Sequence, residues 1–279
     1  MENARVNSTT PTCLRCKNIS YALKNGASLE AIQKLFDAEM VKKVVNKAYD
    51  SIGHLSKSRL GEADSHIDAK TEALLTEKLP PIDCLLYIEE KMDGSNCAVI
   101  RKNGEIIPIS RSGYRCIDSN FEQHRRFHAY VMKRKEQFEK LLPDEDDRVV
   151  GEWLAMAHGT IYPHITEPYQ VFELLKGGKR IGYEEKLALF DQCGFTPVPL
   201  LCMSNIAIPI DEALHMAIER NPLAEGVVYR LERYDKKMNK WVPHLIAKVV
   251  RMDKEDGTYL DEENPIWLWE EKESNDETK

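Results

Sequence analysis

The spacing of apolar and polar side chains separates a weakly patterned N-terminal part of the chain from a strand-rich remainder. Residues 28–51 carry apolar side chains at helical spacing behind Ser28, which is a natural N-cap. Residues 53–78 mix charge with glycine and serine, which indicates a surface segment that ends in a short helix near 69–75. We therefore expect residues 1–79 to form a mostly helical N-terminal extension.

Strand patterns begin at Cys84. The run LLYIEEK is followed by NCAVIRK, and the pair Asn103-Gly104 separates this second run from EIIPIS. An Asn-Gly pair between two β-rich runs is a strong signal for a hairpin. Further strands are predicted at 148–154, 169–175, 225–231 and 244–250.

Three helices are expected among these strands. The first spans 120–142 with Asn120 as its N-cap, the second spans 183–193 before a glycine, and the third begins at Asp211 as N-cap. Strands and helices do not alternate regularly, so the pattern favours an α+β domain of antiparallel sheets with flanking helices over a Rossmann fold. We expect this domain over residues 80–269, followed by a solvated charged tail at 270–279.

The composition is that of an ordinary globular protein, with 42% hydrophobic and 30% charged residues. The formal net charge of −7 argues against general attraction to nucleic acid, because phosphate backbones favour clustered Lys and Arg. Any nucleic-acid surface must therefore be local. No apolar run is long enough to span a bilayer, and the start of the chain lacks the apolar core of a signal peptide. We expect a cytoplasmic protein, or one of another reducing compartment, without a membrane partner.

The seven cysteines are expected to be free thiols, because their number is odd and no secretion signal accompanies them. Cys13 and Cys16 have the spacing of half a zinc site. No second pair completes the four ligands that a structural zinc normally needs. The eight histidines match no zinc spacing either. We therefore expect Cys13 and Cys16 to be free thiols as well.

The most informative string is the run Glu89-Glu90-Lys91-Met92-Asp93-Gly94-Ser95-Asn96. It places a lysine directly after a strand and before a glycine that lets the backbone approach a ligand closely. Alone, the string also suits a solvated lysine beside a turn. Other strings follow in order, each on or beside a predicted strand: Ser110-Arg111-Ser112-Gly113, Gly151-Glu152-Trp153-Leu154, Val171-Phe172-Glu173-Leu174, Glu225-Gly226-Val227-Val228-Tyr229-Arg230 and Ala247-Lys248-Val249-Val250-Arg251.

This ordered series resembles the motifs of the covalent nucleotidyltransferases, the superfamily of ATP-dependent DNA ligases, RNA ligases and messenger-RNA capping enzymes. Asn96 stands two places after the motif glycine, where RNA ligases usually carry Asn and the other two groups usually carry Arg. The strings Lys-Met-Asp-Gly-Ser-Asn, Gly-Glu-Trp-Leu and Ala-His-Gly-Thr-Ile-Tyr are together similar to a broad group of bacterial and viral RNA ligases. The resemblance implies an ATP-dependent RNA ligase with a ligase-type nucleotidyltransferase fold.

The resemblance also implies that Lys91 takes AMP from ATP as a lysyl-adenylate, passes it to a 5′-phosphate end and lets a 3′-hydroxyl displace it. A lysine amine attacks phosphorus only when it is unprotonated, so we expect partial burial and nearby positive charge, including a metal ion, to lower the pKa of Lys91. Lys248 and Arg111 are the expected cations for the phosphate charge. Glu225 and Glu152 are the expected direct or water-mediated partners of Mg²⁺, with Mn²⁺ as a substitute.

Nucleotide-binding residues follow from the same resemblance. Phe172 occupies the place of the aromatic side chain that stacks on adenine, although its apolar strand also suits a plain core aromatic. Asn96 is expected to orient the ribose or the phosphate being sealed. Glu152 is expected either to bind the metal ion or to hold the ribose. Glu90 is expected either to contact the edge of the adenine or to flank the strand without contacting the nucleotide.

The last string departs from the family pattern. The family commonly has two lysines separated by one residue there, but Val250 stands at the second place and Arg251 follows. Arg251 would supply the missing charge if the strand ends or bulges at this point. Strand alternation would otherwise turn its side chain away from Lys248.

The expected partners are ATP and RNA with 5′-phosphate and 3′-hydroxyl ends, as in RNA repair, and no obligate protein partner is indicated. A basic track for RNA is expected from Arg125, Arg126, Lys133, Arg134 and Lys135, with Lys42, Lys43, Lys57 and Arg59 as further candidates. Two alternatives stay open. A DNA-nick ligase would share every adenylation residue, and a non-catalytic nucleotide- or RNA-binding module would keep the fold without the reaction.

Overall fold

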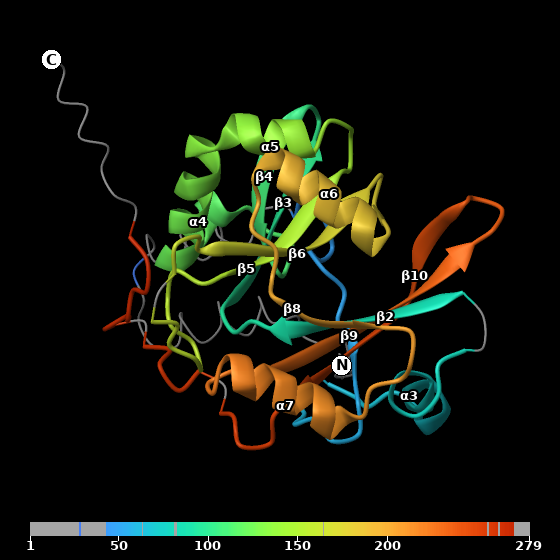
Figure 1. Cartoon of the computed structure of the whole chain (residues 1–279). Coiled ribbons are helices and arrows are strands. Elements are labelled where there is room, and N and C mark those ends of the chain that lie inside the picture. Colours follow the sequence, from blue (N-terminus) through green and yellow to red (C-terminus); the bar gives the residue numbers. More distant parts are fainter. Residues whose placement is uncertain are drawn as a thin grey trace, which may run out of the picture. The chain divides into compact units, whose positions relative to one another are not determined.

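The computed structural model describes Ser28 and residues 43–270, apart from positions 63, 81, 82, 164, 256 and 262. A compact unit begins at Val44. It contains two five-stranded sheets, which we call the first sheet (β1-β10-β9-β2-β8) and the second sheet (β4-β3-β5-β6-β7) (Figure 1). No helix in these described stretches is long and apolar enough to cross a membrane.

The first sheet joins strands that lie far apart in the chain. It consists of β1 (Gly53–His54), β2 (Cys84–Lys91), β8 (Leu200–Ser204), β9 (Gly226–Asp235) and β10 (Lys240–Val250). Neighbouring strands pair antiparallel except β1, which runs parallel to β10. Helices α3 (Ala69–Thr76) and α7 (Ile210–Arg220) pack on this sheet, because Leu75 and Ala213 share a buried cluster with Leu86.

The second sheet is antiparallel throughout. It consists of β3 (Ser95–Lys102), β4 (Glu105–Ser110), β5 (Arg148–Trp153), β6 (Tyr169–Lys176) and β7 (Lys179–Arg180). The predicted hairpin joins β3 to β4. Asn103 (φ 53°) and Gly104 (φ 76°) both have positive φ, as a two-residue type I′ turn requires.

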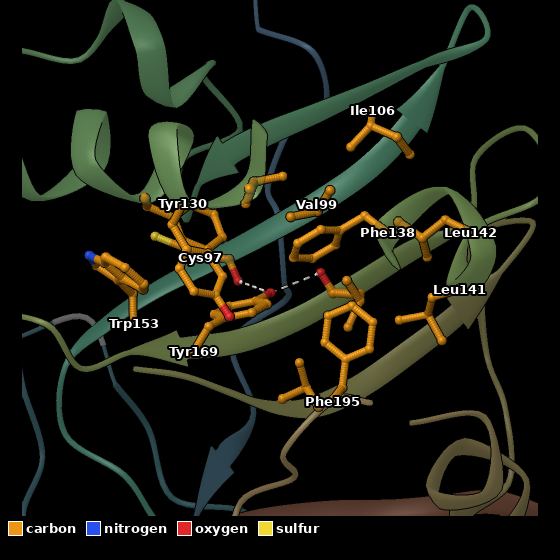
Figure 2. Close-up of a cluster of buried hydrophobic side chains, with 14 of the residues drawn as sticks. Cys97, Val99, Ile106, Tyr130, Phe138, Leu141, Leu142, Trp153, Tyr169 and Phe195 are labelled. Atoms are coloured by element: carbon orange, nitrogen blue, oxygen red, sulfur yellow. Dashed lines mark hydrogen bonds between the residues drawn. The ribbon is translucent and has the colours of Figure 1, made fainter. Parts of the chain in front are cut away.

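Three helices cover one face of the second sheet: α4 (Glu122–Lys133), α5 (Lys135–Leu141) and α6 (Tyr183–Cys193) (Figure 1). An aromatic core fills the space between them, with Trp153 and Phe138 among its buried side chains. Figure 2 shows the hydroxyl of Tyr169 inside this core, donating to the carbonyls of Cys97 (3.2 Å) and Val149 (3.3 Å). These bonds tie together β3, β5 and β6, the strands that carry Asn96, Glu152 and Phe172.

The α+β class with antiparallel sheets and flanking helices is confirmed, and so is the end of α6 at Gly194, which has a φ of 71°. The end of the helix expected over 28–51 is wrong, because residues 43–51 contain no helix. The rest of that segment, apart from its first residue, lies outside the described residues. Backbone bonds to the second sheet explain the difference, since Val44 N donates to Gly113 O (2.9 Å) and Ala48 N to Arg111 O (3.0 Å).

Residues 44–60 cross from the second sheet to the first, and we call them the crossing segment. At its start, Gly113 (φ 85°) allows the two chain segments to approach, because a Cβ there would lie 1.9 Å from Val45 O. Further along, Leu55 N donates to Lys248 O (2.9 Å) next to β1. Part of the expected extension therefore packs within the compact unit.

The helix expected over 120–142 is divided in two, and its predicted cap is wrong. Phe121 occupies the N-cap of α4, and its amide donates to Ser119 Oγ (3.2 Å). Arg134 (φ −111°, ψ 22°) leaves the helical region between α4 and α5. Its guanidinium lies 3.9 Å from the centre of the Tyr130 ring, a cation–π contact.

The predicted cap of α7 is also wrong, because Pro209 occupies the N-cap and Asp211 lies in the first turn. The carboxylate of Asp211 instead lies 2.5 Å from Lys57 Nζ. The described cysteines are free, as predicted: Cys84, Cys97, Cys116, Cys193 and Cys202. Cys13 and Cys16 lie outside the described residues.

Candidate active site

A pocket opens between strands of the two sheets, and the crossing segment closes one side of it. Its lining residues are Tyr49, Asp50, Ser51, Ile52, Glu89, Glu90, Lys91, Met92, Asn96, Arg111, Glu152, Phe172, Glu173, Val198, Val228, Arg230, Ile246 and Lys248. Seven of the nine residues that the sequence predicted for the site are among them. Glu225 joins the site through Lys91, whereas Arg251 does not reach it.

Lys91 is the last residue of β2, and its ammonium group faces carboxylates. Its Nζ lies 2.5 Å from Glu225 Oε2. Burial lowers the pKa of Lys91, but the charges of Glu225 and Glu152 outweigh burial and raise the pKa above its ordinary value. The expectation from the sequence included the positive charge of a metal ion, which would act in the opposite, lowering direction. The two carboxylates therefore favour the protonated amine, and added positive charge would favour the loss of its proton.

Glu152 faces Lys91 from β5. Burial raises the pKa of its carboxyl group to about 7, opposed by the charge of Lys91 and assisted by the charges of Glu225 and Asp93. Glu152 Oε1 also accepts a hydrogen bond from Gly94 N (3.2 Å) in the turn after Lys91. Several carboxyl groups therefore lie close to one lysine.

The turn after Lys91 is held tightly. A Cβ at Gly94 would lie 2.6 Å from Trp153 O, so the motif glycine is required by the close approach of β5. The amide of Asp93 donates to the hydroxyl of Tyr162 (2.8 Å). The turn thus fixes the direction in which Lys91 leaves its strand.

Glu225 and Glu152 suit a divalent cation that takes most of its ligands from elsewhere. Mg²⁺ keeps several waters and binds through one or two carboxylates together with substrate phosphates. No group of three or more His, Cys, Asp or Glu side chains in the described part of the chain could hold a metal. The two carboxylates fit Mg²⁺ or Mn²⁺ bound together with a nucleotide, and such an ion would add positive charge beside Lys91.

Lys248 and Arg111 bring positive charge to the pocket from different sheets. Lys248 lies on β10 opposite Val228, and Arg111 follows β4, with its Nη2 3.5 Å from Ser51 Oγ. Burial and the charge of Lys91 lower the pKa of Lys248. Together with Lys91, these two cations suit an anionic ligand such as a triphosphate.

The apolar part of the pocket contains Phe172, which packs with Met92 and Val198. Tyr49 meets the Phe172 ring edge-on, with centroids 5.2 Å apart and planes at 74°. An aromatic wall of this kind fits a purine base. Asn96 Oδ1 is buried and has no hydrogen-bond partner among the described residues, so it is available to a hydroxyl group of a ligand.

Glu90 borders the pocket, but its carboxylate is occupied elsewhere. It accepts hydrogen bonds from Arg220 Nε (3.2 Å) and Asn221 Nδ2 (3.0 Å) at the end of α7. Glu90 is also almost fully buried. These contacts favour the alternative in which Glu90 supports the strand over contact with adenine.

Arg251 was expected to replace a missing lysine, and its position corrects that expectation. β10 ends at Val250, and the guanidinium of Arg251 turns to Asp253 Oδ2 (2.6 Å) and to the carbonyls of Pro222 (2.8 Å) and Ala224 (3.1 Å). These partners lie outside the pocket lining. Arg251 therefore ties the end of β10 to the loop before β9.

A family model described as RNA ligase matches residues 85–250, which is more than half of the chain. The chain belongs to the RNA ligase family. A search of curated proteins gave no match for it.

Solved structures similar to this RNA ligase family member come from several sources. An archaeal ATP-dependent RNA ligase has 21% identity and a TM-score of 0.41 over 72% of this chain and 48% of that chain. A Naegleria gruberi RNA ligase with PPi has 15% identity and a TM-score of 0.44 over 76% and 61%. A putative ATP-dependent DNA ligase from Aquifex aeolicus has 15% identity and a TM-score of 0.43 over 80% and 62%. This chain thus spans about half the length of the archaeal ligase.

In this RNA ligase family member, charged residues that the sequence did not single out line the pocket or contact the residues that line it. Arg230 Nη1 lies 3.0 Å from Glu173 Oε1, and both side chains are buried. Lys186 of α6 is fully buried, with its Nζ 3.3 Å from Glu89 Oε1 and 2.5 Å from Phe172 O. Glu89, Glu173 and Arg230 belong to strings that marked the site, but nothing in the pattern of α6 distinguishes Lys186 from a surface lysine.

The predicted basic track is partly used for internal contacts. Of its five cations between residues 125 and 135, three are exposed: Arg125, Lys133 and Lys135. Arg126 and Arg134 instead stack on aromatic rings, at 3.6 Å and 3.9 Å from the ring centres. Lys57 pairs with Asp211, and Lys42 lies outside the described residues.

Proposed function

We propose that this chain is an ATP-dependent RNA ligase that works through a covalent AMP on Lys91. The observation that supports the proposal most strongly is the setting of Lys91. Its Nζ lies 2.5 Å from Glu225 in a pocket that Lys248 and Arg111 also line. A solvated lysine beside a turn would have neither the buried carboxylate partner nor the additional cations.

In the first step, the lone pair of Lys91 Nζ forms a bond to the α-phosphorus of ATP while the bond to the pyrophosphate oxygen breaks. The proton of Lys91 leaves toward Glu225, its nearest carboxylate. Lys248 and Arg111 stabilise the charge that develops on the phosphate oxygens and on the leaving pyrophosphate. A bound divalent ion would supply Lewis-acid chemistry at the same oxygens, held by Glu225 and Glu152.

The second and third steps move the AMP and seal the ends. An oxygen of the RNA 5′-phosphate attacks the α-phosphorus, the phosphorus–nitrogen bond breaks, and Lys91 regains its amine. A 3′-hydroxyl oxygen then attacks the 5′-phosphorus, loses its proton, and AMP leaves. Phe172 holds the base in these steps, and Asn96 holds the ribose or the phosphate being sealed.

RNA is expected to reach the pocket along the exposed cations of α4 and α5. Replacing Arg125, Lys133 and Lys135 together by alanine should weaken RNA binding and flatten its salt dependence, by about 0.7 in log–log slope for each phosphate that is no longer neutralised. Binding should be measured at several salt concentrations. An unchanged slope would show that these three side chains do not bind the RNA phosphates.

The proposal is tested with ATP labelled at the α-phosphate and Mg²⁺, followed by a denaturing gel. Wild-type protein should retain the label, Lys91→Ala should not, and Lys237→Ala, in the exposed turn between β9 and β10, should retain it. Binding of ATP without label on the wild-type protein would support the non-catalytic module instead. Nicked duplexes with RNA or DNA on each side of the break then separate an RNA ligase from a DNA-nick ligase.

A further inference from the structure

A closed ring of contacts connects the crossing segment to Lys248. Ser58 Oγ accepts a hydrogen bond from Val250 N (2.8 Å), two residues after Lys248, and lies 2.6 Å from His54 Nδ1. His54 Nε2 lies 3.1 Å from Asp64 Oδ2. Asp64 Oδ1 lies 4.0 Å from Lys248 Nζ, which brings the ring back to β10.

Backbone contacts fix the same stretch of chain against β10. In the parallel pairing of β1 with β10, His54 stands opposite Lys248. Arg59 N donates to Val250 O (2.9 Å). Asp64 itself is held in a turn, because Gly61 N donates to its Oδ2 (3.2 Å). The distance between Asp64 and Lys248 is therefore set by the backbone as well as by side chains.

Asp64, His54 and Ser58 are the residue types of a Ser-His-Asp catalytic triad. The burial and hydrogen bonding of Ser58 exclude a nucleophilic role for it. Ser58 is only 4% exposed. Its Oγ accepts the amide of Val250, so no substrate carbonyl or phosphorus can approach it. The open end of the ring is Asp64, which is partly exposed and faces Lys248.

A carboxylate counter-ion stabilises the charged form of Lys248. This lysine is mostly buried, and both burial and the neighbouring Lys91 lower its pKa. Within the described part of the chain, Lys248 forms one ion pair, in which its Nζ lies 4.0 Å from Asp64 Oδ1. Arg111 and Glu225 also act on Lys248, from the second sheet and from the start of β9. A fixed carboxylate keeps the ammonium charged and limits the directions in which it can point.

We propose that Asp64, which accepts a hydrogen bond from Gly61 N and lies beside His54, is a positioning residue that fixes the Lys248 ammonium for the phosphates of the nucleotide. The inference rests on the proposed function, because Lys248 is assigned there to phosphate charge. It gives the loop between β1 and α3 a role in catalysis although no sequence motif marks that loop. Asp64 acts through Lys248 and does not itself contact the nucleotide.

The test measures lysyl-adenylate formation in a single turnover, over a range of ATP concentrations. Asp64→Asn should lower the rate at saturating ATP about 10-fold, below the 10²–10³-fold typical when a transition-state donor itself is removed. The ATP concentration at half-maximal rate should change less than about 2-fold, because the transition state depends on an oriented Lys248 more than ground-state binding does. Asp64→Glu should recover part of the rate.

A matched control comes from the same loop. Glu72 of α3 accepts from Ser56 N and Ser56 Oγ, both at 2.6 Å, and so anchors the loop without facing Lys248. Glu72→Gln should keep the wild-type rate. Equal loss in Glu72→Gln and Asp64→Asn would overturn the proposal, because both would then act by loosening the loop.

A double-mutant cycle separates positioning from general structure. In a Lys248→Ala background, Asp64→Asn should slow the residual adenylation no further. A further 10-fold loss, or a wild-type rate in the single variant Asp64→Asn, would overturn the proposal. Failure of the wild-type protein to form the adenylate at all is a different result, and it would instead contradict the proposed function.

Discussion

Lys91 and Lys248 lie in one pocket, yet their surroundings are opposite. Lys91 faces Glu225 and Glu152, and these carboxylates raise its pKa against the effect of burial. Lys248 faces Lys91 and Arg111 with Asp64 as a counter-ion, and its pKa is lowered, first by burial. The surroundings therefore shift the pKa values of the two lysines in opposite directions.

In the proposed function, this difference assigns the two lysines different tasks. To act as the proposed nucleophile, Lys91 must lose its proton, and positive charge from a nucleotide bound with a divalent cation would favour this loss by offsetting Glu225 and Glu152. Lys248 needs no such change, because it serves as a cation throughout. This contrast predicts that the two lysines respond differently to the same substitution.

The largest effect is expected from replacing each lysine by arginine. Lys91→Arg should abolish adenylate formation, because a guanidinium is not deprotonated in proteins and cannot act as the nucleophile. Lys248→Arg keeps the positive charge and should slow the reaction by about 10-fold. Single-turnover labelling with ATP measures both. Equal losses in the two variants would contradict the division of roles.

The next largest effect is expected at Glu225. Glu225→Gln removes the carboxylate that lies 2.5 Å from Lys91 Nζ, and with it the proposed proton acceptor and metal partner. We expect adenylation to fall roughly 10²–10³-fold. Asp211→Asn, which removes an exposed carboxylate paired with Lys57, is the control and should keep the wild-type rate. A wild-type rate in Glu225→Gln would contradict the assignment of Glu225 as proton acceptor and metal partner.

A smaller effect is expected at Phe172. Its ring belongs to the apolar part of the pocket and takes no part in the ion pairs of Lys91 and Lys248. Phe172→Ala removes the aromatic wall beside Met92 and Val198. The ATP concentration at half-maximal rate should rise about 3- to 10-fold, the equivalent of one aromatic stacking interaction, with little change in the maximal rate. A loss confined to the maximal rate would show that Phe172 is a core residue and does not stack on the base.

The smallest effect is a pH-dependent change in stability at Glu152. Burial raises its pKa in the folded protein from 4.5 to about 7, so this carboxyl supports folding below the lower value and loses that contribution as pH rises to about 7. Glu152→Gln cannot titrate. In metal-free buffer, the Tm of the variant relative to wild type should therefore increase between pH 5 and pH 8, on the order of 5 °C. A difference that stays constant with pH would contradict the raised pKa.

The sequence predicted much of the fold, because its strands have clear local signals. The Asn103-Gly104 turn, the extent of α6 and the helix at 69–75 follow from turn chemistry and periodicity. Helix caps were predicted less well. Asn120 and Asp211 are good capping residues, but the amide of Phe121 donates to Ser119 and the carboxylate of Asp211 pairs with Lys57. Such competition between partners is decided by tertiary contacts.

The site was predicted where its residues stand in motif strings, and missed where the chain brings in distant segments. Lys91, Glu152 and Lys248 lie together as expected. Tyr49 and Asp64 have no motif, since their position depends on how the crossing segment and its loop pack on both sheets. The charge of Glu225 raises the pKa of Lys91, and because Glu225 lies far away in the sequence, this effect could not be predicted from the string around Lys91.

The most direct test of the account is the location of the covalent AMP. The protein is incubated with ATP and Mg²⁺, digested, and its peptides are examined by mass spectrometry. The account predicts the mass of AMP on the peptide that contains Lys91, and on no peptide that contains Lys248. AMP on Lys248, or unmodified peptides from protein that binds ATP, would contradict it.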